Sequence, residues 1–97
     1  MLVALRLTKS EAQKQLTRLT GWHLRNNRIS RVFLFDDFAQ SMRFVNRVAR
    51  RAESMNHHPD ILILYDRVRL SVTTHDEGGL TMKDFKLAKQ INQLWQS

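Results

Sequence analysis

The sequence contains no cysteine among its 97 residues, which excludes disulfide bonds and thiolate metal ligands. A cysteine-free chain is compatible with a reducing compartment, and we expect a cytoplasmic location. Long apolar runs are also missing, because the N-terminal run MLVAL is interrupted at once by Arg6. This run is too short for a signal peptide or a membrane span, so we expect no membrane association.

Proline and glycine are scarce as well, with one Pro and three Gly. Pro59 stands directly after His57 and His58, and it disfavours helical backbone at His58. Gly78 and Gly79 are adjacent and favour a tight turn, without the other residues of a phosphate-binding loop. The chain therefore places two histidines, which exchange protons near neutral pH, side by side where a helix must end.

Positive charge is abundant, with a net charge of +7 that is unevenly spread. Residues 1–52 hold eleven Lys/Arg against three Asp/Glu, a balance of +8, whereas residues 53–97 hold five against six, a balance of −1. Such asymmetry is compatible with a polyanionic partner. A solvated, arginine-rich helix face also explains it, and we favour this interpretation over nucleic-acid binding.

Hydrophobic periodicity predicts three helices. The first covers about residues 9–19 and opens with Thr8 and Glu11 at capping-box spacing. A longer helix begins after Asp36 or Asp37 and ends before the histidines. The third opens with Thr81 and Asp84. Apolar stripes run along the second helix (Phe38, Met42, Val45, Ala49 and Ala52, widened by Phe44 and Val48) and along the third (Phe85, Ala88, Ile91 and Trp95).

Two hairpins lie between these helices. Asn26-Asn27 separates β-rich runs near 22–25 and 29–35, and Asn tolerates the left-handed conformations of tight turns. In ILILYDRVRLSVTT an aliphatic run is followed by strict alternation of apolar and polar residues. The predicted order is α-β-β-α-β-β-α. We expect an α+β fold, a four-stranded antiparallel sheet covered by helices, forming one domain over residues 1–97.

The predicted topology brings the histidines together. His57 and His58 precede the third strand, His75 follows the fourth, and a hairpin places the start of one beside the end of the other. Glu53 lies one helical turn before His57 and can reach the same place, and Asp84 lies in the first turn of the last helix. Imidazoles and carboxylates without an evident nucleophile are suited to proton transfer.

Other interpretations stay open at this point. Adjacent histidines also occur as incidental loop residues. Three histidines with a carboxylate could bind zinc, but His57 and His58 tend to point apart in extended backbone, so we predict no metal site. Asp84 could serve only as an acidic residue favoured at a helix start.

The spacing of these residues resembles one family, the pterin-4a-carbinolamine dehydratases. Their pattern runs E-x-x-x-H-H-P, then Y-x-x-V, then T-H-x-x-G-G-L-T-x-x-D. A comparable GW and F-x-F-x-D-F occur at 21–22 and 33–38, and Ile61 stands where some members have an aromatic residue. The matching positions are Glu53, His57, His58, Pro59, Tyr65, Val68, Thr74, His75, Gly78, Gly79, Leu80, Thr81 and Asp84.

The resemblance implies an activity: removal of water from 4a-hydroxytetrahydropterin to give quinonoid dihydropterin. This reaction recycles the pterin that an aromatic amino acid hydroxylase has used. It implies that His57, His58 and His75 are catalytic, with no cofactor besides the pterin substrate. His58 would bind substrate and take the N5 proton, and His57 and His75 would protonate the leaving group. The remaining substrate-site residues would orient the imidazoles or hold the pterin, namely Glu53, Pro59, Thr74 and Asp84.

The resemblance also implies a homodimer or homotetramer, because family members form sheet-extended dimers and pair them through helices. One animal member additionally acts as a dimerisation cofactor for a transcription factor. The alternative function is therefore a basic binding module or transcriptional coactivator without turnover.

Overall fold

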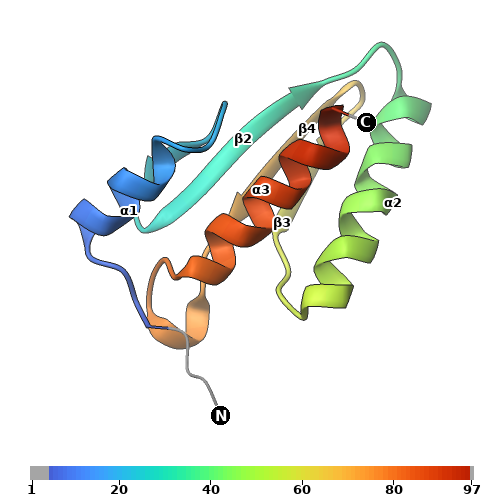
Figure 1. Ribbon diagram of the computed structural model, residues 1–97. Coiled ribbons are helices and arrows are strands. Elements are labelled where there is room, and N and C mark those ends of the chain that lie inside the picture. Colours follow the sequence, from blue (N-terminus) through green and yellow to red (C-terminus); the bar gives the residue numbers. More distant parts are fainter. Residues whose placement is uncertain (1–4, 97) are drawn as a thin grey trace.

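The computed structural model describes residues 5–96. The elements follow the predicted order (Figure 1). They are α1 (Lys9–Leu16), β1 (His23–Arg25), β2 (Arg28–Leu34), α2 (Phe38–Met55), β3 (Asp60–Leu64), β4 (Arg67–Val72), the 3-10 turn η1 (His75–Glu77) and α3 (Met82–Gln96). Helix α1 ends three residues earlier than predicted, and η1 lies in the segment predicted to be a loop.

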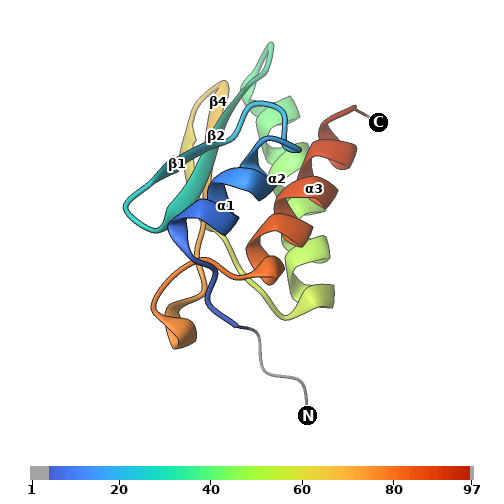
Figure 2. The same ribbon diagram turned by 60° about the vertical axis from the view of Figure 1, so that its left-hand side comes forward.

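The sheet has the strand order β1-β2-β4-β3, and all neighbours are antiparallel. Figure 2 shows the sheet on one side and the helices on the other, with α2 and α3 packed along its length. The register pairs Asp60 with Ser71, so β3 begins beside the end of β4. No helix among residues 5–96 is long and apolar enough to span a membrane.

The core lies between the sheet and α2 and α3. The predicted alternation in β4 is confirmed, because Val68, Leu70 and Val72 are buried. Phe33 contacts the rings of Phe44 and Trp95 with centroids 4.8 and 5.2 Å apart. These aromatic side chains therefore form part of the core.

Helix α2 is rotated slightly relative to the predicted stripe. Phe38 is 50% exposed and Ala49 is exposed, so two of the predicted positions were wrong. Phe44 and Val48, expected only to widen the stripe, lie near its centre because they face the sheet. The buried positions of α2 are Ser41, Phe44, Val45, Val48 and Ala52.

The ends of α2 are clearly defined. The Asp37 side chain accepts a hydrogen bond from the Gln40 backbone N–H at 2.8 Å, so Asp37 rather than Asp36 is the cap. At the other end, Asn56 adopts the left-handed conformation with φ 50°, and Asn tolerates this region better than most residues. The helix therefore ends before His57, as Pro59 predicted.

Candidate active site

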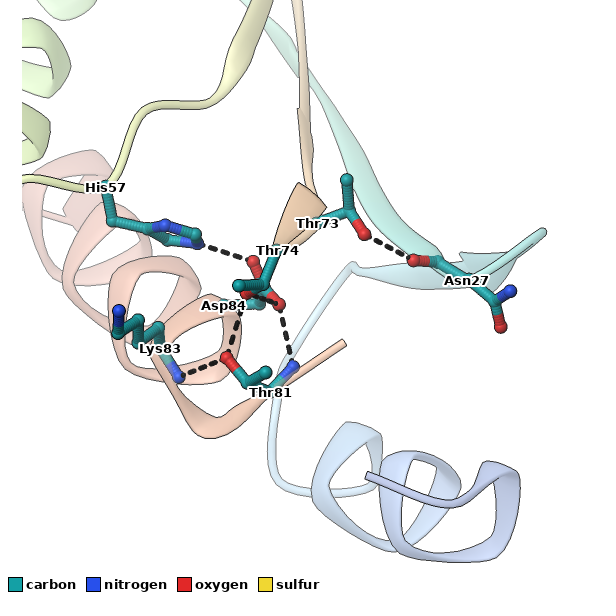
Figure 3. A network of polar contacts seen from close by, with 7 residues as sticks. All are labelled: Asn27, His57, Thr73, Thr74, Thr81, Lys83 and Asp84. Carbon is teal, nitrogen blue, oxygen red and sulfur yellow. Dashed lines mark hydrogen bonds and ion pairs between the residues drawn. The ribbon is translucent and has the colours of Figure 1, made fainter. Parts of the chain in front are cut away.

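Three segments meet at one end of the sheet: the α2–β3 connection, the end of β4 with η1, and the start of α3 (Figure 1). The first segment carries His57 and His58, the second Thr74 and His75, and the third Asp84. The close-up in Figure 3 shows His57 pointing toward Asp84 and Thr74. The predicted convergence of the α2–β3 connection with the start of α3 is thus observed directly.

His57 is held by Asp84. Its Nε2 lies 2.6 Å from Asp84 Oδ1, and the exposed fractions of the two side chains are 11% and 0%. A carboxylate that accepts a hydrogen bond from one imidazole nitrogen fixes both the ring orientation and the tautomer. Nδ1 of His57 is then the ring atom left to exchange a proton with a ligand.

Asp84 is in turn held by its own neighbours. Its Oδ2 accepts hydrogen bonds from the Thr74 hydroxyl at 2.8 Å and from the Thr81 backbone N–H at 2.9 Å (Figure 3). The Thr74 and Thr81 hydroxyl oxygens are 2.9 Å apart. No buried side-chain nitrogen or oxygen among residues 5–96 lacks a partner. Asp84 is therefore both a helix-start residue and the centre of a satisfied buried polar network.

Thr81 is the member of this network that sequence reasoning did not assign to the site. The signal was available, because Thr81 and Asp84 have helix-capping spacing. By itself, that spacing predicts only the start of a helix. The burial of Thr81, which the sequence does not reveal, distinguishes this residue from an ordinary helix cap.

His58 has a different environment from its neighbour. Its Nε2 lies 2.8 Å from Glu53 Oε2, and the exposed fractions of the two side chains are 56% and 79%. Glu53 belongs to the last turn of α2 and reaches past the helix end, as expected. His57 and His58 thus point to carboxylates on different helices, which agrees with the expectation that adjacent imidazoles point apart.

His75 lies on the surface in η1, next to the buried Thr74. The backbones of Thr74 and Gly79 exchange hydrogen bonds of 3.2 and 3.3 Å, which close the loop that carries His75. Gly78 has φ 71°, a conformation that favours glycine. Thr74 itself is 6% exposed, so the structure places its hydroxyl inside the network.

A groove in another part of the structure lies away from the histidines. A groove of about 990 Å³ runs between α1 and the first hairpin, and residues such as Arg6, Leu16 and Leu24 line it. Its lining contains none of the three predicted catalytic histidines. Within residues 5–96, no three His, Asp or Glu side chains are grouped so that they could hold one metal ion.

Comparisons with known proteins match the chain to one family. The family model described as pterin 4 alpha carbinolamine dehydratase matches residues 5–94. A curated protein of Acidobacterium capsulatum is 50% identical over 88 residues, covering 91% of this chain and 96% of that protein. One of Sulfurisphaera tokodaii is 46% identical over 89 residues, covering 92% and 96%. Both carry the name "Putative pterin-4-alpha-carbinolamine dehydratase".

Two solved structures share the fold. A transcriptional coactivator/pterin dehydratase from Brucella melitensis superposes with a TM-score of 0.88 at 37% identity, covering 92% of this chain and 97% of that one. A pterin dehydratase-like protein identified as a RuBisCO assembly factor in the alpha-carboxysome superposes with a TM-score of 0.64 at 19% identity. That match covers 78% of this chain and 88% of the other, and it bears on the fold alone.

Proposed function

This chain belongs to the pterin 4 alpha carbinolamine dehydratase family, and we propose that it removes water from a 4a-hydroxytetrahydropterin to give the quinonoid dihydropterin. The observation that carries the proposal is the His57–Asp84 pair, in which a fully buried carboxylate holds one imidazole nitrogen at 2.6 Å. A surface histidine without a role would not require a dedicated buried partner. We propose that the reaction belongs to recycling of the pterin that an aromatic amino acid hydroxylase uses.

The proposed step breaks the bond between C4a and its hydroxyl oxygen. A proton from the enzyme converts the departing hydroxide into water. Loss of the N5 proton leaves the electron pair that forms the C4a–N5 double bond. One proton is donated and one is taken up, so the total number of protons on the enzyme is unchanged, and neither oxidation nor reduction occurs. Proton exchange between the imidazoles or with water then restores the starting state. The step needs an acid and a base near neutral pH, which paired imidazoles supply.

His57 and His75 are assigned to protonation of the leaving group. The hydrogen bond of Nε2 to Asp84 orients the His57 ring, so the proton that His57 gives to the leaving group is the Nδ1 proton of the doubly protonated ring. His75 is exposed on a closed turn next to Thr74, where it can approach a ligand that covers this end of the sheet. Thr74 and Asp84 act at the substrate site by holding His57 in place.

His58 is assigned to substrate binding and to the N5 proton. Glu53 orients its ring through the 2.8 Å contact at Nε2. Pro59 fixes the backbone between His58 and the first residue of β3, and so sets the direction in which the imidazole leaves the chain. No further cofactor is assigned, because the pterin is the substrate.

The decisive test of this proposal is a dehydratase assay. Synthetic 4a-hydroxytetrahydropterin would be mixed with the purified chain, and quinonoid dihydropterin would be followed by its absorbance against the uncatalysed rate. We expect acceleration that is unchanged by a chelator. No acceleration at micromolar enzyme would overturn the proposal, and a chelator-sensitive rate restored by zinc would replace it with metal-dependent chemistry.

We further propose a homo-oligomer built on the edge strand β3. This strand leaves Ile61, Leu62 and Leu64 37%, 49% and 55% exposed, and its outer backbone has no partner strand among residues 5–96. An apolar unpaired edge favours pairing with a second copy. Sedimentation at micromolar concentration should give a dimer or tetramer, and a strictly monomeric mass would contradict the proposal.

The second candidate function is a basic binding module or coactivator without turnover, which the positive charge favours. Several arginines of the basic half already have structural partners: Arg28 pairs with Asp60 at 2.8 Å, and Arg31 binds the Thr20 carbonyl and Asn92. Arg43 and Arg50 of α2 are exposed, which supports the interpretation of a solvated, arginine-rich helix face. Any DNA binding should be sequence-independent and lost steeply with salt, whereas sequence preference at physiological salt would favour the second candidate.

A further inference from the structure

The hydroxyl of Thr81 lies at the start of a hydrogen-bond chain that ends at His57. Thr81 is 0% exposed and Asp84 is 0% exposed. The Lys83 backbone N–H donates to Thr81 Oγ1 at 3.2 Å. Thr81 Oγ1 and Thr74 Oγ1 are 2.9 Å apart, and the Thr74 hydroxyl donates to Asp84 Oδ2 at 2.8 Å (Figure 3).

The donor and acceptor of each hydrogen bond in this chain can be assigned, because each hydroxyl group has only one proton to donate. A hydroxyl carries one proton, and the proton of Thr74 is directed to Asp84. Thr74 can therefore only accept from Thr81, so Thr81 donates to Thr74. Thr81 accepts from Lys83 N–H, and both hydroxyl groups thus donate once and accept once. All protons point toward the Asp84 carboxylate.

We infer that Thr81 is a positioning residue: acting through Thr74, it holds the Asp84 carboxylate in place and so strengthens the preference of neutral His57 for the tautomer that carries its proton on Nε2. Hydrogen bonds aligned in one direction strengthen each other, so the Thr81 hydroxyl makes Thr74 a better donor to Asp84. Oδ1 is then held in the orientation that receives the Nε2 proton of His57. Nδ1 is consequently the nitrogen that gains and then gives up the proton in the proposed reaction.

The same hydroxyl pair also ties the loop of His75 to helix α3. Thr74 precedes His75 directly, and its backbone pairs with Gly79 to close the loop. Thr81, the residue directly before α3, bonds the Thr74 side chain. Removing the Thr81 hydroxyl should therefore loosen both the His57 ring and the loop carrying His75. The effect on the His75 loop follows from the same Thr74–Thr81 hydrogen bond.

Nitrogen-15 NMR of the histidine rings tests the tautomer independently of turnover. Spectra would be recorded at about pH 9, where a histidine of ordinary basicity is neutral. Wild type should show His57 as the Nε2–H tautomer with slow exchange of that proton. Thr81→Val should show a mixed tautomer with faster exchange, and Thr81→Ser should restore the wild-type signals because it keeps the hydroxyl.

A matched control comes from the other Thr-capped helix. Thr8 caps α1 with the same three-residue spacing to an acidic partner, is exposed, and exchanges its hydrogen bonds with Glu11. Thr8→Val should remove a cap of the same kind and leave the His57 signals unchanged. An equal change in both valine variants would overturn the inference, because general loss of stability would then explain the effect.

The rate test rests on the proposed dehydratase activity. Thr81→Val should lower kcat about tenfold with little change in KM, since the ring is misplaced rather than the substrate lost. Thr81→Ser should recover most of that loss. If wild type does not accelerate dehydration, the proposed function fails. The NMR measurement of the His57 tautomer then still tests the role of Thr81. An Nδ1–H tautomer in wild type, which needs no variant, would overturn it outright.

Discussion

His57 and His58 are neighbours in sequence, yet the structure supports them in opposite ways. His57 pairs with Asp84, a fully buried carboxylate from another helix 27 residues away. His58 pairs with Glu53, an exposed carboxylate five residues earlier. Exposed charge pairs contribute little to stability, because water screens them and the side chains stay mobile. A buried, multiply bonded pair holds its geometry much more firmly.

This difference indicates that the two histidines have different roles in the proposed reaction. The His57 ring has one nitrogen committed and one free, whereas the His58 ring sits on the surface and can adjust to a ligand. A rigid imidazole suits proton transfer at a fixed atom, and an adaptable imidazole suits contact with an incoming substrate. Mutations in the two pairs should therefore have unequal effects.

The largest effect is expected from removing single imidazoles. His57→Ala, His58→Ala and His75→Ala should each lower the dehydration rate by roughly 10²–10⁴-fold, the usual contribution of one proton-transfer group. The loss should be smaller where a neighbouring histidine substitutes. Initial rates on synthetic substrate, with circular dichroism to confirm the fold, measure it. Equal, near-wild-type rates in all three variants would contradict the assignment.

The next largest effect separates the two carboxylates. Asp84→Asn places an amide where three donors converge, so it should lower the free energy of unfolding by about 1–3 kcal/mol and also slow the reaction. Glu53→Gln changes an exposed side chain, and its stability should stay within about 0.5 kcal/mol of wild type. Urea unfolding of both variants compares them. Equal destabilisation by the two substitutions would remove the distinction between the pairs.

The smallest effect concerns the exposed cap of α1, formed by Thr8 and Glu11. Hydrogen bonds from the Thr8 backbone N–H and from its hydroxyl hold the pKa of Glu11 below its ordinary value of 4.5. Because the folded pKa is lowered, this stabilisation is present above pH 4.5 and is lost as the pH falls through the folded pKa. Glu11→Gln should therefore lower Tm slightly at neutral pH and have less effect in acid. A larger effect on Tm in acid than at neutral pH would contradict a stabilising role of the ionised Glu11 at this cap.

The caps that open α1 and α3 also show what the sequence could predict and what it could not. Thr8 with Glu11 and Thr81 with Asp84 have the same spacing, and both correctly predicted a helix start. Spacing gives no information on burial, which depends on the sheet and loop packed against the helix. One cap is consequently exposed, and the other became the centre of the candidate site.

The histidine partners illustrate the same limit. Pro59 and the second hairpin were sufficient to predict that the helix ends before His57 and that the segments converge. The choice of partner depends on Asn56, whose left-handed conformation redirects the chain after α2. If the helix had continued, Glu53 would have faced His57 at a spacing of four residues. The turn instead gives Glu53 to His58 and sends His57 toward Asp84.

The stripe of α2 was predicted only approximately for a related reason. Periodicity locates an apolar face, but the exact rotation of a helix is set by the side chains it meets. Phe44 packs against Phe33 and Phe35, so the helix turns to bury Phe44 and Val48, and Phe38 remains half exposed.

The most direct test of the account is the dehydration rate of the double variant His57→Ala/His58→Ala beside wild type, on synthetic 4a-hydroxytetrahydropterin. The variant should remain folded by circular dichroism, and its rate should fall to the uncatalysed background and below that of either single variant, unless the two residues act as one unit. A folded double variant that dehydrates the substrate at the wild-type rate would contradict histidine acid–base catalysis at this site.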